Sequence, residues 1–182
     1  YRHPLAGTFG VSKNRSADVA WTFTDSAYRT PDASQIPMPL VFNAQPIFPK
    51  DSVSVPLKKW KMETAVSGGP VLVQEGKVKV TNNEEWKFAG KAIEDRHPRT
   101  AIGYTADNKV VLLVIEGRNP GKAEGATLSQ TGAMLISAGC VEGLNLDGGG
   151  SSCMLVNGKE TIHPSDKEGQ RAVPGIFYIR KK

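Results

Sequence analysis

The sequence of 182 residues predicts a single α+β domain, with a mostly antiparallel or mixed β-sheet and few helices packed on it. Two observations favour this class. Short apolar runs bounded by turn residues recur along the chain, whereas only one segment has convincing helical periodicity. With 39% hydrophobic residues, the chain can bury one substantial core.

Residues 1–64 predict an irregular, proline-rich N-terminal segment that wraps the core, and whether it is complete at its N-terminus is left open. Prolines from Pro31 to Pro56 break any long helix, and only Val19–Thr24 alternates clearly enough for a strand. The remaining residues, 65–182, are predicted to form the core of the domain.

The first elements of this core are a hairpin and a short helix. The turn at Glu75 and Gly76 separates the apolar run Val71–Val73 from Lys77–Val80, which is typical of a two-residue hairpin. A short helix is predicted over Asn83–Ala89.

A second hairpin is predicted where Ala101–Tyr104 and Val110–Ile115, both rich in β-forming residues, flank a polar turn. The apolar spacing of Thr127–Ala138 then predicts a helix whose start is capped by Thr127 or Ser129. Gly139 is expected to end it.

The run Asn145–Ser152 is predicted to be a loop that joins two buried strands, because apolar residues precede and follow it. A turn at Asn157 and Gly158 comes next. The last predicted strand is Ile176–Ile179.

The composition excludes several classes of protein. A net charge of +5 favours anionic ligands, but no basic block with interleaved aromatic residues indicates nucleic acid. No apolar run reaches the roughly 18 residues of a transmembrane helix. Cys140 and Cys153 are interpreted as two separate thiols, although one disulfide between them is left open.

The loop Asn145–Ser152 also carries the main candidate site. Consecutive glycines let a ligand approach the backbone, and their N–H groups can hold an anion. Asp147 is the first candidate for a functional carboxylate, and Asn145 lies two residues before it on the same strand face. The alternative is structural, because aspartate commonly bonds its own backbone in turns.

Two arginines are predicted to meet at one end of the second hairpin. Arg99 and Arg118 could clamp a phosphodiester through bidentate hydrogen bonds, or instead pair at the surface with Glu116 or Asp95. Arg171 is a further candidate for the same role.

Five separated motifs, taken in order, resemble the phosphodiester glycosidase family. They are Ser67–Pro70, Arg96–Gly103, Glu116–Arg118, Asn145–Ser152 and Arg171. The match covers roughly residues 65–180, and the ordered spacing makes it more specific than a lone glycine loop.

The resemblance implies a hydrolase that cleaves the glycosidic C1–O bond of a sugar-1-phosphodiester, such as one that removes N-acetylglucosamine from a phosphodiester-linked glycan. Asp147 and Glu116 are the expected catalytic carboxylates, since glycoside hydrolysis generally uses two. The expected substrate-binding residues are Arg99, Arg118, Thr100, Asn145, Gly148, Gly149, Gly150, Ser151, Ser152, Gly68, Gly69 and Arg171.

The resemblance also gives expectations about cofactors, partners and location. No cofactor is expected to be required, but a divalent cation, Ca or Mg, held by Asp147 and Asn145 is left open. The expected partner is a carbohydrate or sugar phosphate. A secreted, periplasmic or cell-envelope location follows from the resemblance alone.

Two alternative functions stay open. Members of the family carry a further N-terminal part that residues 1–64 do not match, so the chain could be a non-catalytic module that binds carbohydrate or phosphate. A serine hydrolase would use Ser151 or Ser152 as its nucleophile, but no histidine spacing supports this reading.

Overall fold

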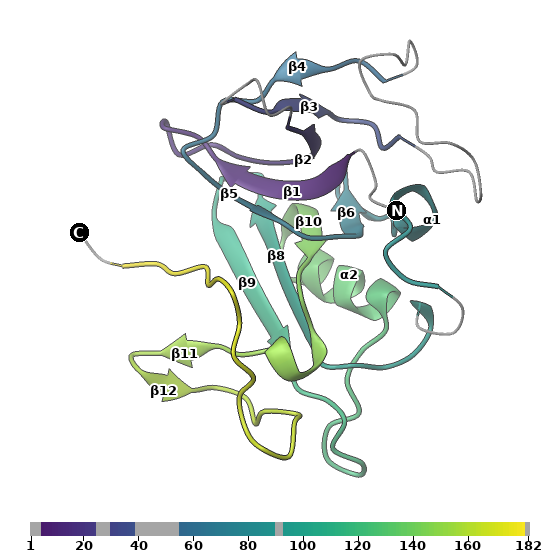
Figure 1. Cartoon of the computed structure of the whole chain (residues 1–182), viewed down its shortest axis with the longest axis vertical. Coiled ribbons are helices and arrows are strands. Elements are labelled where there is room, and N and C mark those ends of the chain that lie inside the picture. The colour runs from purple at the N-terminus through teal and green to yellow at the C-terminus, as the bar shows by residue number, and fades with distance from the viewer. Residues whose placement is uncertain (1–4, 25–29, 39–54, 90–92, 181–182) are drawn as a thin grey trace.

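The computed structural model describes residues 5–24, 30–38, 55–89 and 93–180, and it consists of two stacked five-stranded sheets with a helix on one side (Figure 1). The strand pairs of both sheets are antiparallel. The predicted α+β class with a mostly antiparallel sheet and few helices is therefore confirmed.

The first sheet has the strand order β4-β3-β2-β1-β5. Its strands are β1 (Ala6–Val11), β2 (Ala17–Phe23), β3 (Asp32–Ser34), β4 (Lys58–Lys59) and β5 (Thr64–Ser67). The predicted strand Val19–Thr24 is confirmed as β2, whereas the prediction of otherwise irregular structure up to residue 64 is wrong for β1, β3 and β4. The glycines and the threonine of β1 interrupt its apolar pattern, so the sequence does not indicate a strand there. Gly10 is needed for packing, since a Cβ atom at this position would lie 2.5 Å from the Trp60 ring.

The second sheet has the strand order β7-β6-β10-β8-β9. Its strands are β6 (Val71–Gln74), β7 (Lys77–Val78), β8 (Arg99–Thr105), β9 (Val110–Ile115) and β10 (Cys140–Asn145). Both predicted hairpins, β6–β7 and β8–β9, are confirmed. This sheet is the middle layer, with apolar contacts on both faces, which explains its uninterrupted apolar runs.

Helix α2 (Leu128–Ser137) covers the outer face of the second sheet. Its predicted start is confirmed: Thr127 accepts the N–H of Gln130, and the Gln130 side chain accepts the N–H of Thr127 in return. These reciprocal bonds form a capping box, which satisfies two backbone donors at the helix start. Gly139 follows the helix with a φ of 86°.

Two apolar layers hold the sheets and the helix together. Phe9, Trp21, Ile102 and Leu144 are among the buried residues between the two sheets. On the other face of the second sheet, the buried side chains under α2 are Leu72, Val73, Ala101, Leu128, Leu135 and Cys140. Burial of each large apolar side chain contributes about 1.5–3 kcal/mol.

The shorter elements lie outside these layers. Helix α1 (Asn82–Glu85) covers part of the predicted 83–89 helix, and turn η3 (Gly149–Ser151) lies in the glycine loop. Strands β11 (Leu155–Val156) and β12 (Lys159–Glu160) form a hairpin about the predicted Asn157–Gly158 turn.

Two predictions about the C-terminal part are wrong. The glycine loop does not join two buried strands, because Leu155 of β11 is 59% exposed. Ile176–Ile179 is not a strand, since within the described residues it has no sheet partner and its side chains are largely exposed. Only Phe177 reaches the core, where its ring meets Phe9 edge-on at 6.3 Å.

The two cysteines are not bonded to each other. Cys140 is buried and Cys153 half-buried, and both are free thiols, so the interpretation as separate thiols is confirmed. Burial raises the pKa of the Cys140 thiol. No helix of the described residues is both long and apolar enough to cross a membrane.

A polar bridge links the two sheets. Glu142 on β10 accepts the Val19 N–H of β2 at 3.0 Å and the Tyr104 hydroxyl at 2.7 Å. Burial raises the pKa of the Glu142 carboxyl, and the nearby Asp18 adds to this, while the two hydrogen bonds oppose it. The fold therefore favours the protonated form of Glu142 more than the unfolded chain does.

Replacing Glu142 by glutamine is expected to remove one component of the pH dependence of stability. With a raised folded-state pKa, the contribution of Glu142 is fully present below the unfolded pKa of about 4.5 and is lost as the pH rises through the folded pKa. Urea unfolding at about pH 4 and pH 7 should therefore show a smaller relative loss towards pH 7 in Glu142→Gln than in the unaltered protein. An unchanged difference, or the same change in the exposed control Glu160→Gln, would contradict this role.

Candidate active site

A cleft of about 450 Å³ opens at the edge of the second sheet where β8 begins and β10 ends. Antiparallel pairing places these two strand ends together, since Asn145 lies opposite Ala101. The cleft is lined by Gly68, Gly69, Lys87, Phe88, His97, Pro98, Arg99, Arg118, Asn145, Leu146, Asp147, Gly148, Gly149 and Arg171. Most of the predicted site residues therefore do meet in one place.

Arg99 lines this cleft, and the residue is almost fully buried. The residue is 4% exposed; its Nε donates to the Ala126 carbonyl at 2.9 Å and its Nη2 to the Asp95 carbonyl at 3.0 Å. The guanidinium also stacks over the Phe88 ring at 5.8 Å. The pKa of Arg99 is lowered by burial and by the nearby Arg118.

No carboxylate of the described residues lies within 4.0 Å of the Arg99 guanidinium. The surface pairing that the sequence left open, with Glu116 or Asp95, is therefore not seen. A buried cation with no carboxylate in direct contact is costly, since Asp95 attracts it only from a longer distance, and an anionic ligand would offset that cost. Arg99 thus has the environment of an anion-binding residue rather than of a structural ion pair.

Arg118 approaches the same cleft from the segment after β9. Its backbone is left-handed, with a φ of 59°, which is uncommon for a residue other than glycine. Its guanidinium lies over Gly149, about 3.1 Å from where a Cβ atom would be. Asp166 is 4.0 Å from Arg118 and also pairs with Arg171, at 2.9 Å. All three arginines therefore border one cleft.

Asn145 and Asp147 line the cleft with side chains that carry oxygen atoms. Asn145 is 2% exposed, and its Nδ2 donates to the carbonyls of Gly69 and Leu146. Its Oδ1 has no hydrogen-bond partner among the described residues. Asp147, two residues on, is exposed at the surface of the cleft. The pair presents one unsatisfied acceptor and one carboxylate to a ligand.

At several glycines of the site, other groups of the protein occupy the space that a side chain would need. A Cβ atom on Gly68 would lie 2.4 Å from the Asn145 carbonyl oxygen, and one on Gly148 would lie 2.7 Å from that of Pro98. On Gly150 it would lie 2.1 Å from Asp166. These positions therefore require glycine, because any side chain there would clash with neighbouring groups of the chain.

Five predicted site residues do not line the cleft: Glu116, Thr100, Gly150, Ser151 and Ser152. Glu116 accepts the backbone N–H of His163 at 3.0 Å. The Thr100 hydroxyl donates to that of Ser152, which is 1% exposed. The structure thus leaves Asp147 without Glu116 as a close carboxylate partner.

Five residues that line the cleft were not among the predicted site residues: His97, Lys87, Phe88, Pro98 and Leu146. The buried Nδ1 of His97 has no partner among the described residues. The pKa of His97 is lowered by burial and by Arg99 and Arg118, so its imidazole is neutral at pH 7. The sequence did offer one indication that His97 belongs to the site, because it lies between Arg96 and Arg99.

Among the described residues, no group of three or more His, Cys, Asp or Glu side chains is arranged to hold a metal ion. The expectation that no cofactor is required stays a prediction, and a divalent cation held by Asp147 and Asn145 stays open.

Comparison with known proteins decides the family. The phosphodiester glycosidase family model matches residues 20–180. The chain belongs to the phosphodiester glycosidase family. The family match begins well before residue 65, so it also includes much of the first sheet, which the resemblance in the sequence did not cover.

Curated relatives match over parts of the chain. The bovine N-acetylglucosamine-1-phosphodiester alpha-N-acetylglucosaminidase is 35% identical over 68 residues, which are 37% of this chain and 12% of that protein. The human enzyme of the same name is 28% identical over 102 residues, or 56% and 19% of the two chains. An uncharacterised SPbeta prophage-derived protein of Bacillus subtilis is 33% identical over 95 residues, or 52% and 14%. The matched region is thus a small part of each relative.

Two solved structures share the fold of this chain. The catalytic domain of the zebrafish N-acetylglucosamine-1-phosphodiester alpha-N-acetylglucosaminidase, auto-inhibited by its pro-peptide, superposes with a TM-score of 0.58 at 20% identity. The superposition covers 93% of this chain and 50% of the zebrafish chain. A Burkholderia pseudomallei protein whose name suggests export gives a TM-score of 0.61 at 17% identity, covering 94% and 56%.

Proposed function

We propose that this chain hydrolyses a sugar-1-phosphodiester between the anomeric carbon and the bridging oxygen, as in the removal of N-acetylglucosamine from a phosphodiester-linked glycan. Membership of the phosphodiester glycosidase family and the names of the bovine and human relatives support the reaction class and the sugar. The observation that carries the proposal is Arg99, a buried guanidinium without a carboxylate partner in a cleft that also holds Asp147.

In this proposal Arg99 binds the phosphate from inside the cleft and Arg118 from its rim. Planar guanidiniums match two phosphate oxygens at once, and a buried site strengthens the attraction. The hydrogen bonds from Arg99 to Ala126 and Asp95 hold its side chain in place before the ligand arrives. Such preorganised donors stabilise the negative charge that develops on the leaving group.

Asp147 acts on the sugar, as a nucleophile at C1 or as the base that activates water. The Oδ1 of Asn145 accepts a hydrogen bond from a sugar hydroxyl, which satisfies an atom that is otherwise buried without a partner. The leaving phosphate needs little protonation because it departs as a stable anion. The neutral His97 imidazole is the remaining group of the cleft that could transfer a proton.

Hydrolysis in ¹⁸O-labelled water tests the bond that breaks. Cleavage at C1–O is expected to place the label on the released sugar, with none in the phosphate. Mass spectrometry of both products after one turnover measures this. Label in the phosphate would mean attack at phosphorus and would rule out the proposed reaction.

A non-catalytic module of the same family makes a different prediction. It would bind N-acetylglucosamine-1-phosphate esters tightly but release no sugar, however long the incubation. An extracytoplasmic location is also proposed, supported by the family resemblance and by the name of the structurally similar Burkholderia pseudomallei protein, which suggests export. Fractionation of the native host tests that location, since finding the protein in the cytoplasm would contradict it.

A further inference from the structure

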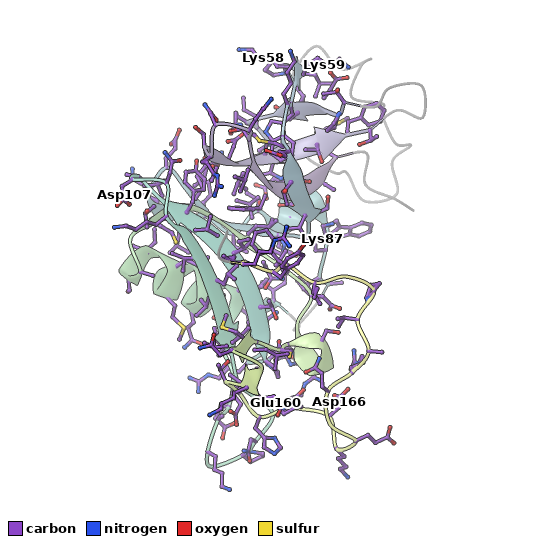
Figure 2. All side chains as sticks on the ribbon, turned by 90° about the vertical axis from the view of Figure 1, so that its left-hand side faces the viewer. Lys58, Lys59, Lys87, Asp107, Glu160 and Asp166 are labelled. Carbon is purple, nitrogen blue, oxygen red and sulfur yellow. The ribbon has the colours of Figure 1, made fainter. Side chains whose placement is uncertain are left out.

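Asp166 is a carboxylate outside the cleft that contacts two of its arginines. It accepts from Arg171 Nε at 3.1 Å and from Nη2 at 2.9 Å, through the same oxygen. Its other oxygen lies 4.0 Å from Nη1 of Arg118. In Figure 2, Asp166 lies just below the turn η3. A single acidic group thus joins the two arginines of the outer rim.

The main chain holds Asp166 in this position on several sides. The His163 N–H donates to Glu116 at the end of β9, and the Gly169 N–H closes a turn on the Asp166 carbonyl at 3.0 Å. Beneath it, Gly150 leaves room for the carboxylate, because a Cβ atom there would lie 2.1 Å from Oδ2. These contacts fix the carboxylate between the glycine loop and the rim of the cleft.

We propose that Asp166 is a positioning residue that directs Arg118 and Arg171 towards the phosphate bound by Arg99. This inference rests on the proposed function, since it assigns a role in the same site. Arg118 and Arg171 are half-exposed, with 45% and 52% of their side-chain surface open, so each has many rotamers without a partner. One carboxylate restricts both side chains. Glu116, in turn, acts on the loop that carries Asp166.

The sign of the effect separates this role from simple charge neutralisation. If Asp166 only cancelled positive charge, removing its charge would raise the potential of the cleft and tighten the binding of anions. If it positions the two arginines, the same change loosens them and weakens binding. The two roles therefore predict opposite changes in phosphate affinity.

Calorimetric titration of the whole chain with inorganic phosphate tests the proposal. Asp166→Asn is expected to weaken phosphate binding about tenfold, because two charge-assisted contacts lose their alignment. The matched control is Asp107→Asn, which removes an exposed carboxylate paired with Lys109 in the β8–β9 turn. Its phosphate affinity should stay within about twofold of the unaltered protein.

Gly150→Ala provides an independent route to the same result. The added methyl group displaces the Asp166 carboxylate without removing its charge, so phosphate binding should weaken as in Asp166→Asn. With a sugar-1-phosphodiester, KM should rise several-fold in both variants while kcat stays within about threefold, a split that general destabilisation does not produce.

Three results would count against the proposal. Tighter or unchanged phosphate binding by Asp166→Asn would overturn the positioning role alone. So would an equal loss of phosphate affinity in Asp107→Asn. No phosphate binding by the unaltered chain would overturn the proposed function, and the role of Asp166 with it.

Discussion

Replacing Asp147 by asparagine is expected to lower kcat for a sugar-1-phosphodiester at least about a thousandfold, because asparagine can act neither as nucleophile nor as base. Phosphate affinity should change by less than about threefold, since the arginines remain and one acidic group is lost. Initial rates and calorimetric titration with inorganic phosphate measure the two effects separately. Asp147 is exposed, so the free energy of unfolding should change by no more than about 0.5 kcal/mol.

The control for this experiment is again Asp107→Asn, at the opposite end of β8 from the cleft. Its kcat should match that of the unaltered protein. If Asp147→Asn retained more than about a tenth of the activity, Asp147 would not be the catalytic carboxylate. His97 would then be the next group of the cleft to replace.

Replacing Arg99 by methionine is the second large expected effect. Methionine keeps much of the length and packing of the side chain but removes the charge that holds phosphate. The value of kcat/KM should fall about a hundred- to a thousandfold, as is typical when a preorganised donor to a developing anion is removed. Phosphate binding should become undetectable by calorimetry.

Stability should respond much less than activity to Arg99→Met. The carbonyls of Ala126 and Asp95 each lose one hydrogen bond, which costs about 0.5–1.5 kcal/mol each, because Ala126 still accepts the His97 N–H and Asp95 is exposed. Relief from burying an unpaired cation offsets most of this cost, so we expect a net change of about 1 kcal/mol in urea unfolding. Arg96→Met, at an exposed position three residues earlier, is the matched control. Normal turnover by Arg99→Met would refute the phosphate-binding role.

The local elements were predictable because their signals are local. A threonine with a glutamine three positions later marks the start of α2, and two-residue turns mark the β6–β7 and β11–β12 hairpins. The site residues Arg99, Arg118, Asn145, Asp147 and Arg171 could also be found, since each stands in a motif beside a strand end or a turn. Their convergence follows from the antiparallel pairing of β8 and β10.

What the sequence could not predict depends on contacts between distant segments. Gly150 looked like a place for a ligand, but Asp166 fills that space, and nothing near Gly150 in the sequence indicates this. Glu116 was paired with Asp147 from its motif and its residue type, whereas in the structure it accepts the His163 N–H. Ile176–Ile179 has the composition of a strand but lacks a neighbour with free backbone groups among the described residues.

The way the cleft is put together also has a consequence for folding kinetics. Asn145 bonds to Gly69 across 76 residues of sequence, and Glu142 ties β10 to Val19 across 123. Contacts of such separation form late and slowly, because the chain must close long loops before they gain any free energy. Phosphate binding should therefore appear only in the final phase of refolding, and bound phosphate should slow the first step of unfolding.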